Sequence, residues 1–181
     1  MSSFADDTNE DIADSKSSAR MECEKIFREA EDGAINSGRV LVMTNISKFP
    51  NMVQLILLAE AHNMVTVIVG MMKTQTEDLI NIGLKFFRLE NIPTLNVWLK
   101  RHKISLLGIE IMDSARSVHE NPFSARIALM PGNEGTGLSL QQKSICDGFV
   151  IIPQYGTATA SLNVHVATCL VLHRFCRWAA S

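Results

Sequence analysis

Residues 129–139 read LMPGNEGTGLS, and residues 151–167 read IIPQYGTATASLNVHVA. In each stretch a short apolar run leads through a glycine-rich loop into a segment whose apolar residues have helical spacing. Ligands of open α/β sheets bind beside such loops, outside the carboxyl ends of the strands. The two stretches therefore predict a ligand site at a place where two strands end.

The glycine spacing in the first stretch disfavours two common nucleotide sites. Residues 132–137 follow the pattern G-x-x-G-x-G, whereas dinucleotide-binding proteins have G-x-G-x-x-G on their first strand-to-helix turn. The chain also lacks the phosphate loop G-x-x-x-x-G-K-[ST]. Neither a redox dinucleotide nor a nucleoside triphosphate is indicated.

Outward from these loops, short apolar runs alternate with helical patterns. Strands are expected at 40–43, 65–69, 104–111, 125–130 and 148–152. Helices are expected at 51–62 with Asn51 as N-cap, near 76–83, and at 93–102, 139–146 and 161–178 with Ser161 as cap. This alternation predicts an α/β fold with an open, mostly parallel sheet.

The composition is that of one globular domain. At 181 residues the chain can bury one sizeable core, and 46% hydrophobic with 20% charged residues is ordinary for such a domain. No run approaches the roughly 18 apolar residues of a membrane helix, and the N-terminus resembles neither a secretory signal nor a transit peptide. We expect a soluble intracellular protein, cytoplasmic by default, with a mitochondrial or nuclear location left open.

The first 38 residues differ from the rest. Residues 1–19 are polar and acidic, which predicts a disordered tail, and residues 20–38 predict a short added helix with a linker. Residues 39–181 form the predicted domain. Five acidic residues and no basic one lie within residues 1–15, so the remainder is mildly basic, and this balance permits a nucleic-acid partner. The basic run 100–103 predicts a solvated helix end, with contact to an RNA backbone as the alternative.

Cysteine and histidine spacing suggests no metal site. The four cysteines form no C-x-x-C pair, so free reduced thiols are expected. His165, Cys169 and His173 share one helical face, a spacing that zinc accepts. Because this helix is otherwise apolar, we interpret them as core or interface side chains, with zinc as the less favoured alternative.

The two glycine-rich stretches closely resemble motifs two and three of the SpoU (TrmH-like, SPOUT) family of RNA 2′-O-ribose methyltransferases. The family patterns G-N-E-x-x-G and I-P-x-x-G-x-x-x-S-L-N-V-x-V-A are matched in order at every named position. Residues 108–110 also resemble the family's eukaryotic tRNA guanosine branch. The resemblance implies a C-terminal trefoil knot, S-adenosyl-L-methionine as cofactor, tRNA or rRNA as substrate, and a homodimer paired through the C-terminal helix.

The resemblance also implies the site residues. The cofactor would be held by the residues that match the family's three loops, with glycines 132, 135 and 156 permitting close approach of the backbone. These residues are Glu110, Met130, Gly132, Asn133, Gly135, Ile152, Gly156, Ser161 and Leu162. Residues assigned to catalysis by position are Asn51, Glu134, Ser161 and Asn163.

Motif one departs from the family pattern. Asn51 and residues 59–61 match it, but Val53 replaces the usual glycine and Leu57 replaces the arginine implied to act on the ribose hydroxyl. Two hypotheses follow. The first is methylation of a ribose 2′-hydroxyl in tRNA or rRNA. The second is a catalytically impaired member of the same fold that acts as an RNA-binding or ribosome-assembly factor.

Overall fold

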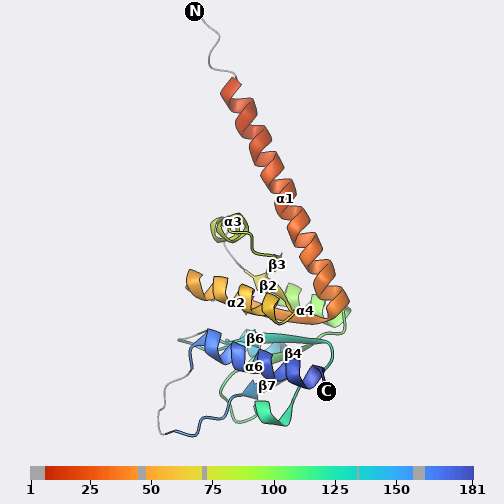
Figure 1. Cartoon of the computed structure of the whole chain (residues 1–181), viewed down its shortest axis with the longest axis vertical. Helices are drawn as coiled ribbons and strands as arrows, with labels where there is room; N and C mark the ends of the chain where they lie inside the picture. The colour runs from red at the N-terminus through yellow and green to blue at the C-terminus, as the bar shows by residue number, and fades with distance from the viewer. Residues whose placement is uncertain (1–6, 45–47, 71–72, 134, 157–161) are drawn as a thin grey trace, which may run out of the picture.

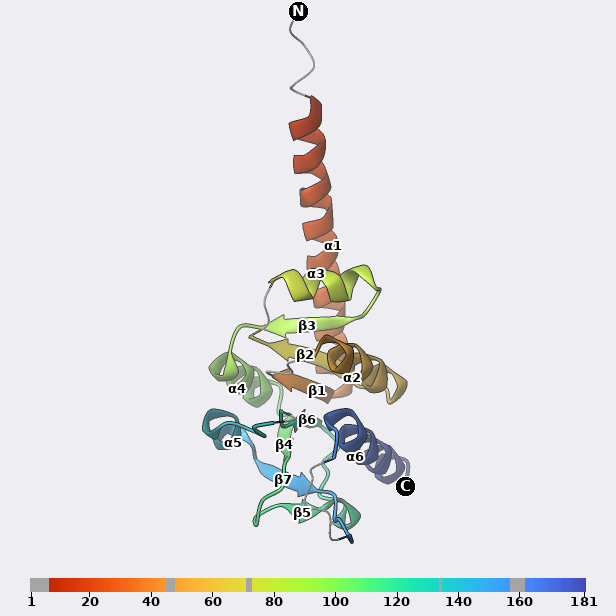
Figure 2. The ribbon, with the colours of Figure 1, turned by 90° about the vertical axis from the view of Figure 1, so that its left-hand side faces the viewer.

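The computed structural model describes residues 7–44, 48–70, 73–133, 135–156 and 162–181, and within them seven parallel strands form one sheet. The strand order is β3-β2-β1-β6-β4-β7-β5, and each neighbouring pair is parallel. Figures 1 and 2 show the sheet between two layers of helices. The predicted α/β class with a mostly parallel sheet is confirmed.

The helices and strands alternate along the chain. The helices are α1 (Asp7–Ser37), α2 (Phe49–Ala61), α3 (Lys73–Asn81), α4 (Ile92–Arg101), α5 (Leu140–Ile145) and α6 (Val164–Ala179), with one 3-10 turn, η1 (Val118–Glu120). The strands are β1 (Arg39–Thr44), β2 (Val65–Val69), β3 (Phe86–Leu89), β4 (Ser105–Ile109), β5 (Arg116–Ser117), β6 (Ile127–Pro131) and β7 (Gly148–Ile151).

The central strands are buried on both faces, which explains their unbroken apolar runs. In β1, Leu41 and Met43 face the core beneath α2 and α6, whereas Val40 and Val42 face the core beneath α1 and α4. Figure 2 shows α2 and α6 on one side of the sheet and α4 and α5 on the other. The two cores hold the carboxyl ends of β4, β6 and β7 side by side.

Helix α1 differs from the predicted disordered tail and short helix. Residues 7–19, expected to be disordered, belong to one helix of 31 residues that continues to Ser37. The second half packs on the sheet through Ala30 and Ala34, and the first half projects away from it (Figure 1). Extending a helix that is already nucleated by packing costs little.

Several element boundaries also differ from the sequence prediction. Helix α2 begins at Phe49 with Lys48 as N-cap, so Pro50 lies in its first turn and Asn51 is not the cap. Helix α6 begins at Val164 with Asn163 as N-cap, and the predicted cap Ser161 lies outside the described residues. Strands β3 and β5 were not predicted, because runs of four and two residues at sheet edges carry too little periodicity.

Three further predictions concern the knot, the cysteines and membrane helices, and the structure describes each to a different extent. The loop before α6 includes residues 157–161, which are not described, so the knot stays a prediction. All four cysteines are free and partly buried, and burial with the neighbouring Asp147 charge raises the pKa of Cys146 to about 12. Among the described helices none is long and apolar enough to cross a membrane.

Candidate functional site

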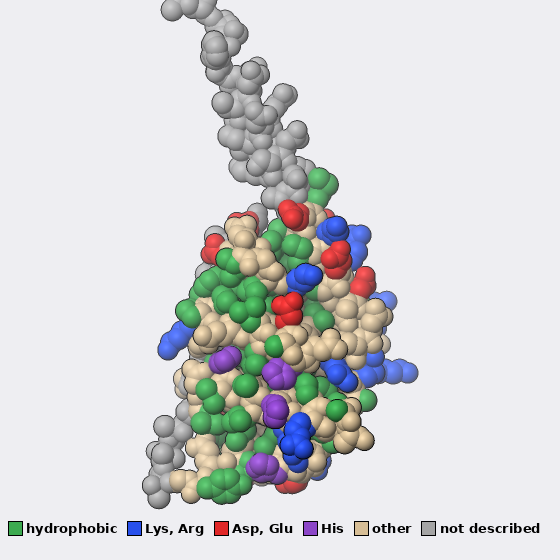
Figure 3. Space-filling model, in the orientation of Figure 1, with side chains coloured by type: hydrophobic (Ala, Val, Ile, Leu, Met, Phe, Trp, Pro, Cys, Tyr) green, Lys and Arg blue, Asp and Glu red, His purple; other side chains and the backbone are tan. Residues whose placement is uncertain are grey.

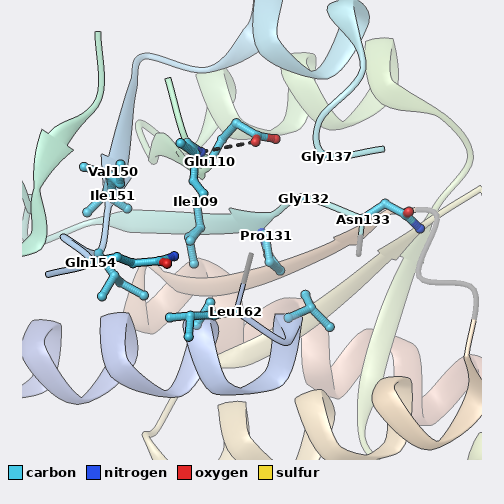
Figure 4. A pocket seen from close by; sticks show the side chains of 14 residues that line it. Ile109, Glu110, Pro131, Gly132, Asn133, Gly137, Val150, Ile151, Gln154 and Leu162 are labelled. Carbon is cyan, nitrogen blue, oxygen red and sulfur yellow. Dashed lines mark hydrogen bonds between the residues drawn. The ribbon is translucent and has the colours of Figure 1, made fainter. Parts of the chain in front are cut away.

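A cavity lies at the carboxyl ends of β4, β6 and β7, where their loops meet the first turns of α6 (Figure 4). It is an open cavity, and its empty space of about 590 Å³ includes open solvent. Its described lining consists of Ile109, Glu110, Ile111, Pro131, Gly132, Asn133, Gly137, Val150, Ile151, Ile152, Gln154, Leu162, Val164 and Ala167. This is the edge of the sheet that the glycine-rich stretches predicted.

Glu110 is the one ionisable side chain in that described lining, and it joins two loops. Its Oε2 accepts a hydrogen bond of 2.6 Å from the backbone N–H of Leu138, and its Oε1 accepts one of 3.1 Å from that of Ile111. In Figure 4 the carboxylate points from the end of β4 toward the loop at Gly137. Glu110 therefore holds the loop after β6 against the end of β4.

Two glycines allow this close approach. A Cβ on Gly132 would lie 2.9 Å from Glu110 Oε2 and 3.0 Å from the Cα of Gly137. Gly137 has φ +65°, and a Cβ there would overlap the same Glu110 oxygen. Only glycine adopts this backbone without strain and leaves room for the carboxylate.

The loop between these glycines is closed by its own backbone. Asn133 and Gly137 exchange two backbone hydrogen bonds, of 3.1 and 2.9 Å. The Asn133 side-chain oxygen also accepts hydrogen bonds from the N–H groups of Gly135, at 2.9 Å, and Thr136, at 3.2 Å. Asn133 thus shapes the loop from within, a common role of asparagine in turns.

The end of the loop is anchored to the centre of the sheet through Gln142. Its Oε1 accepts a hydrogen bond of 2.6 Å from the N–H of Ser139, and its Nε2 donates to the hydroxyl of Thr44 at the end of β1. Both Gln142 and Thr44 are buried, so this link is protected from water. The cavity wall is therefore braced from β4 and from β1.

The opposite wall is mainly apolar. Leu162 contributes its side chain there, and Gln154 adds a neutral amide (Figure 4). The lining also includes Ile152 and Val164. Asn163 accepts a hydrogen bond of 2.9 Å from the N–H of His165, which caps α6. A cavity with apolar walls, a glycine-lined loop and one carboxylate suits a neutral or cationic organic ligand better than a phosphate.

The structure brings together five of the residues predicted to bind the cofactor. These are Glu110, Gly132, Asn133, Ile152 and Leu162. The others are placed differently, since Met130 is fully buried in the core and neither Gly135 nor Gly156 is part of the lining. Of the predicted catalytic residues, Asn51 lies on α2 and Asn163 caps α6, both outside the lining, while Glu134 and Ser161 lie outside the described residues.

Sequence reasoning missed several lining residues. The most informative is Gly137, the third glycine of the G-x-x-G-x-G pattern, whose positive φ could not be read from spacing alone. Pro131 directly follows Met130, and Gln154 directly follows the proline of the third family motif. The apolar residues at the strand ends were indistinguishable in sequence from buried core residues. Whether a residue at a strand end faces the cavity or the core depends on how the strands are arranged in the sheet.

A partly apolar surface extends over α2 and α6, which pack side by side (Figures 1 and 3). Leu57 on α2 is 49% exposed, and Val166 and Leu170 on α6 are 45% and 47% exposed. Further along α6, Phe175 is fully buried, and Trp178 lies half-buried against Phe123.

The described residues contain no group of three or more His, Cys, Asp or Glu side chains arranged to hold a metal ion. His165, Cys169 and His173 lie on α6, which packs on the sheet through Val171, Leu172 and Phe175. No role in metal binding is assigned to them.

The fold and the cavity define a class: an α/β protein with a parallel sheet and an organic-ligand site in the loops at its carboxyl edge. Residues 38–173 match the model of the SpoU rRNA Methylase family. The chain belongs to this family, and helix α1 lies entirely outside the matched region.

Individual relatives agree with that assignment. The 23S rRNA (guanosine-2′-O-)-methyltransferase RlmB of Acinetobacter baylyi is 33% identical over 94 residues, which cover 51% of this chain and 38% of that protein. The chain thus spans well under half the length of this curated relative.

Solved structures share the fold. The SpoU methyltransferase AviRb from Streptomyces viridochromogenes, in complex with AdoMet, aligns with a TM-score of 0.64 at 22% identity, covering 78% of this chain and 58% of that one. The A. aeolicus TrmH/SpoU tRNA modifying enzyme aligns with a TM-score of 0.62 at 19% identity, covering 86% and 83%. Identities this low support the fold alone.

Proposed function

We propose that this chain binds S-adenosyl-L-methionine in the cavity and methylates a ribose 2′-hydroxyl of tRNA or rRNA. The observation that carries the proposal is the loop held by Glu110 and made possible by Gly132 and Gly137. The family assignment supports the reaction class, and the relative from Acinetobacter baylyi carries a name that specifies 2′-O-methylation of rRNA.

The residues fit such a cofactor. The apolar wall at Ile152 and Leu162 suits a purine ring, and the loop at Gly132 brings backbone groups to the ligand without side chains in between. Each Glu110 oxygen accepts one backbone N–H, which leaves further lone pairs for ribose hydroxyls or an ammonium group. When bound, the cofactor supplies a methyl group that a ribose oxygen can attack.

The catalytic assignments remain part of this proposal. In the sequence, Glu134 lies between Gly132 and Gly137. Ser161 directly precedes Leu162, and Asn163 is the N-cap of α6. Among the described lining residues there is no basic side chain to orient or deprotonate the nucleophile. We therefore propose that this group comes from a residue outside the lining or from a second subunit.

The proposal predicts measurable binding of S-adenosyl-L-methionine and of S-adenosylhomocysteine. Calorimetry should show saturable heat, and thermal unfolding should shift upward, since a ligand that binds only the folded state stabilises it. Transfer of a labelled methyl group to total RNA would then test the reaction, with digestion to nucleosides to locate the label on ribose. Absence of both heat and thermal shift with either ligand would contradict cofactor binding.

We also propose a homodimer formed through α2 and α6. Leu57, Val166 and Leu170 are each nearly half exposed, an apolar surface of the kind that protein partners cover. Light scattering at micromolar concentration should give about 40 kDa, twice the chain's 20.0 kDa. Leu170→Glu should yield folded monomers, whereas Leu140→Glu, at an 87% exposed position on α5, should not change the mass. A wild-type mass near that of one chain would refute the dimer.

A further inference from the structure

Three helices end in the same kind of turn. In α4, the N–H of Ile104 donates to the carbonyl of Leu99 at 3.0 Å, and the N–H of Lys103 donates to that of Lys100 at 3.2 Å. The same pair of bonds closes α2 at Asn63 and α3 at Gly83. This Schellman motif requires a left-handed residue just after the helix, which is usually glycine and sometimes asparagine.

Lys103 is the exception to this preference. Its φ is +54°, close to the +53° of Asn63 at the end of α2. Within the part of the chain that the structure describes, every other residue with positive φ is glycine or asparagine. A lysine strains the backbone in this conformation, because its Cβ crowds the following carbonyl and it lacks the short polar side chain that helps asparagine. A lysine at a strained backbone position is the sort of outlier that points to function.

Helix capping does not account for the cation. The turn itself occupies the carbonyls of Leu99 and Lys100, and Arg126 Nε donates to the carbonyl of His102 at 3.3 Å. Lys100 and Arg101 lie in the last turn with ordinary helical backbone, where cations already interact favourably with the helix dipole. Glycine at position 103 would form the same turn without strain.

The three cations of this turn are available to a partner. Lys100, Arg101 and Lys103 are exposed, and no carboxylate of the described residues forms an ion pair with them. Their turn precedes β4, whereas Glu110 follows β4 and lines the cavity. The five residues of β4 separate the two by roughly 17 Å at about 3.3 Å per residue.

We propose that Lys103, with Lys100 and Arg101, forms a contact for the phosphate backbone of the RNA. This contact rests on the proposed function, which supplies an RNA substrate. Because the turn lies at the sheet edge opposite the cavity, it would hold nucleotides that flank the target and contribute affinity without base specificity. The lysine at 103 adds a third cation at the expense of backbone strain.

The test exploits the opposite effects expected on stability and binding. Lys103→Gly should raise the melting temperature by relieving strain, and should weaken binding of bulk tRNA about fivefold while lowering the salt dependence by about one ion. Asn63→Gly is the matched control at the same turn of α2. It should leave tRNA affinity unchanged, because no cation is removed.

Three results would contradict the proposed phosphate contact. A Lys103→Gly protein that is more stable yet binds tRNA as tightly as the wild type would overturn it, as would a wild type with no affinity for tRNA. Wild-type binding through this turn to vesicles rich in phosphatidylserine, without binding to tRNA, would also overturn it in favour of a membrane surface. Cofactor affinity, measured on the same proteins, should be unaffected by Lys103→Gly, so a failure of cofactor binding would be recognised separately.

Discussion

Replacing Gly137 by alanine is expected to weaken S-adenosyl-L-methionine binding by about 100-fold, equivalent to roughly 2.7 kcal/mol. The new Cβ would overlap Glu110 Oε2, and φ of +65° is strained for alanine. To relieve both, the loop must move away from β4, which breaks the 2.6 Å hydrogen bond from Leu138 to Glu110. Calorimetry on the folded variant, with circular dichroism to confirm folding, measures the effect.

Gly135→Ala provides the control within the same loop. A Cβ at Gly135 would meet its nearest neighbour, Asn133 Oδ1, at 3.7 Å, an ordinary contact. Cofactor affinity should therefore stay within about threefold of the wild type, since such a contact is near van der Waals separation. Equal affinities for Gly137→Ala and wild type would show that the loop held by Glu110 takes no part in cofactor binding.

Leu57→Arg is expected to raise methyl transfer by about 100-fold or more, the range attributed to a positioned group that assists proton transfer. The reason is that Leu57 replaces the arginine of motif one that the family resemblance implies. The fold of the single chain should tolerate the change, because Leu57 is 49% exposed and substitutions at such positions usually alter stability by about 0.5 kcal/mol or less. Since Leu57 also lies on the surface proposed to form the dimer, activity is compared at a protein concentration at which light scattering shows that the variant is dimeric. Methylation of total RNA and thermal unfolding measure the two effects.

Gln54→Arg is the matched control for Leu57→Arg. Gln54 is exposed one turn earlier on α2 and receives the same charge without occupying the motif position. Its activity should equal that of the wild type. A Leu57→Arg protein that folds, dimerises and binds the cofactor, yet methylates no RNA, would support a non-catalytic RNA-binding or ribosome-assembly role.

The strand loops illustrate why the general location of the site could be predicted. In a parallel sheet all carboxyl ends meet at one edge, so two glycine-rich stretches after apolar runs must lie near each other. The residues that meet across that edge were less predictable. Glu110 lies 28 positions before Leu138 in the chain, and no local pattern could reveal their hydrogen bond.

Helix ends and exposed faces were predicted less well from the sequence. Asn51 was a reasonable N-cap by residue type, but Pro50 suits the first turn equally well, and the helix begins at Phe49. Leu57 lies in an apolar helix that looked buried, yet the packing of α2 against β2 and α6 leaves it half exposed. Lys103 looked like one of several surface cations until its backbone conformation was known.

By itself the sequence determined the α/β class, the edge of the sheet that carries the site, and the resemblance to the SpoU family. These depend on periodicity and on motifs whose residues are neighbours in the chain. Only the tertiary structure decided that Glu110 closes the loop at Gly137, that Leu57 faces outward, and that Lys103 takes a left-handed backbone. The physical reason is that each of these depends on which distant segment packs against the residue, and packing is a property of the whole fold.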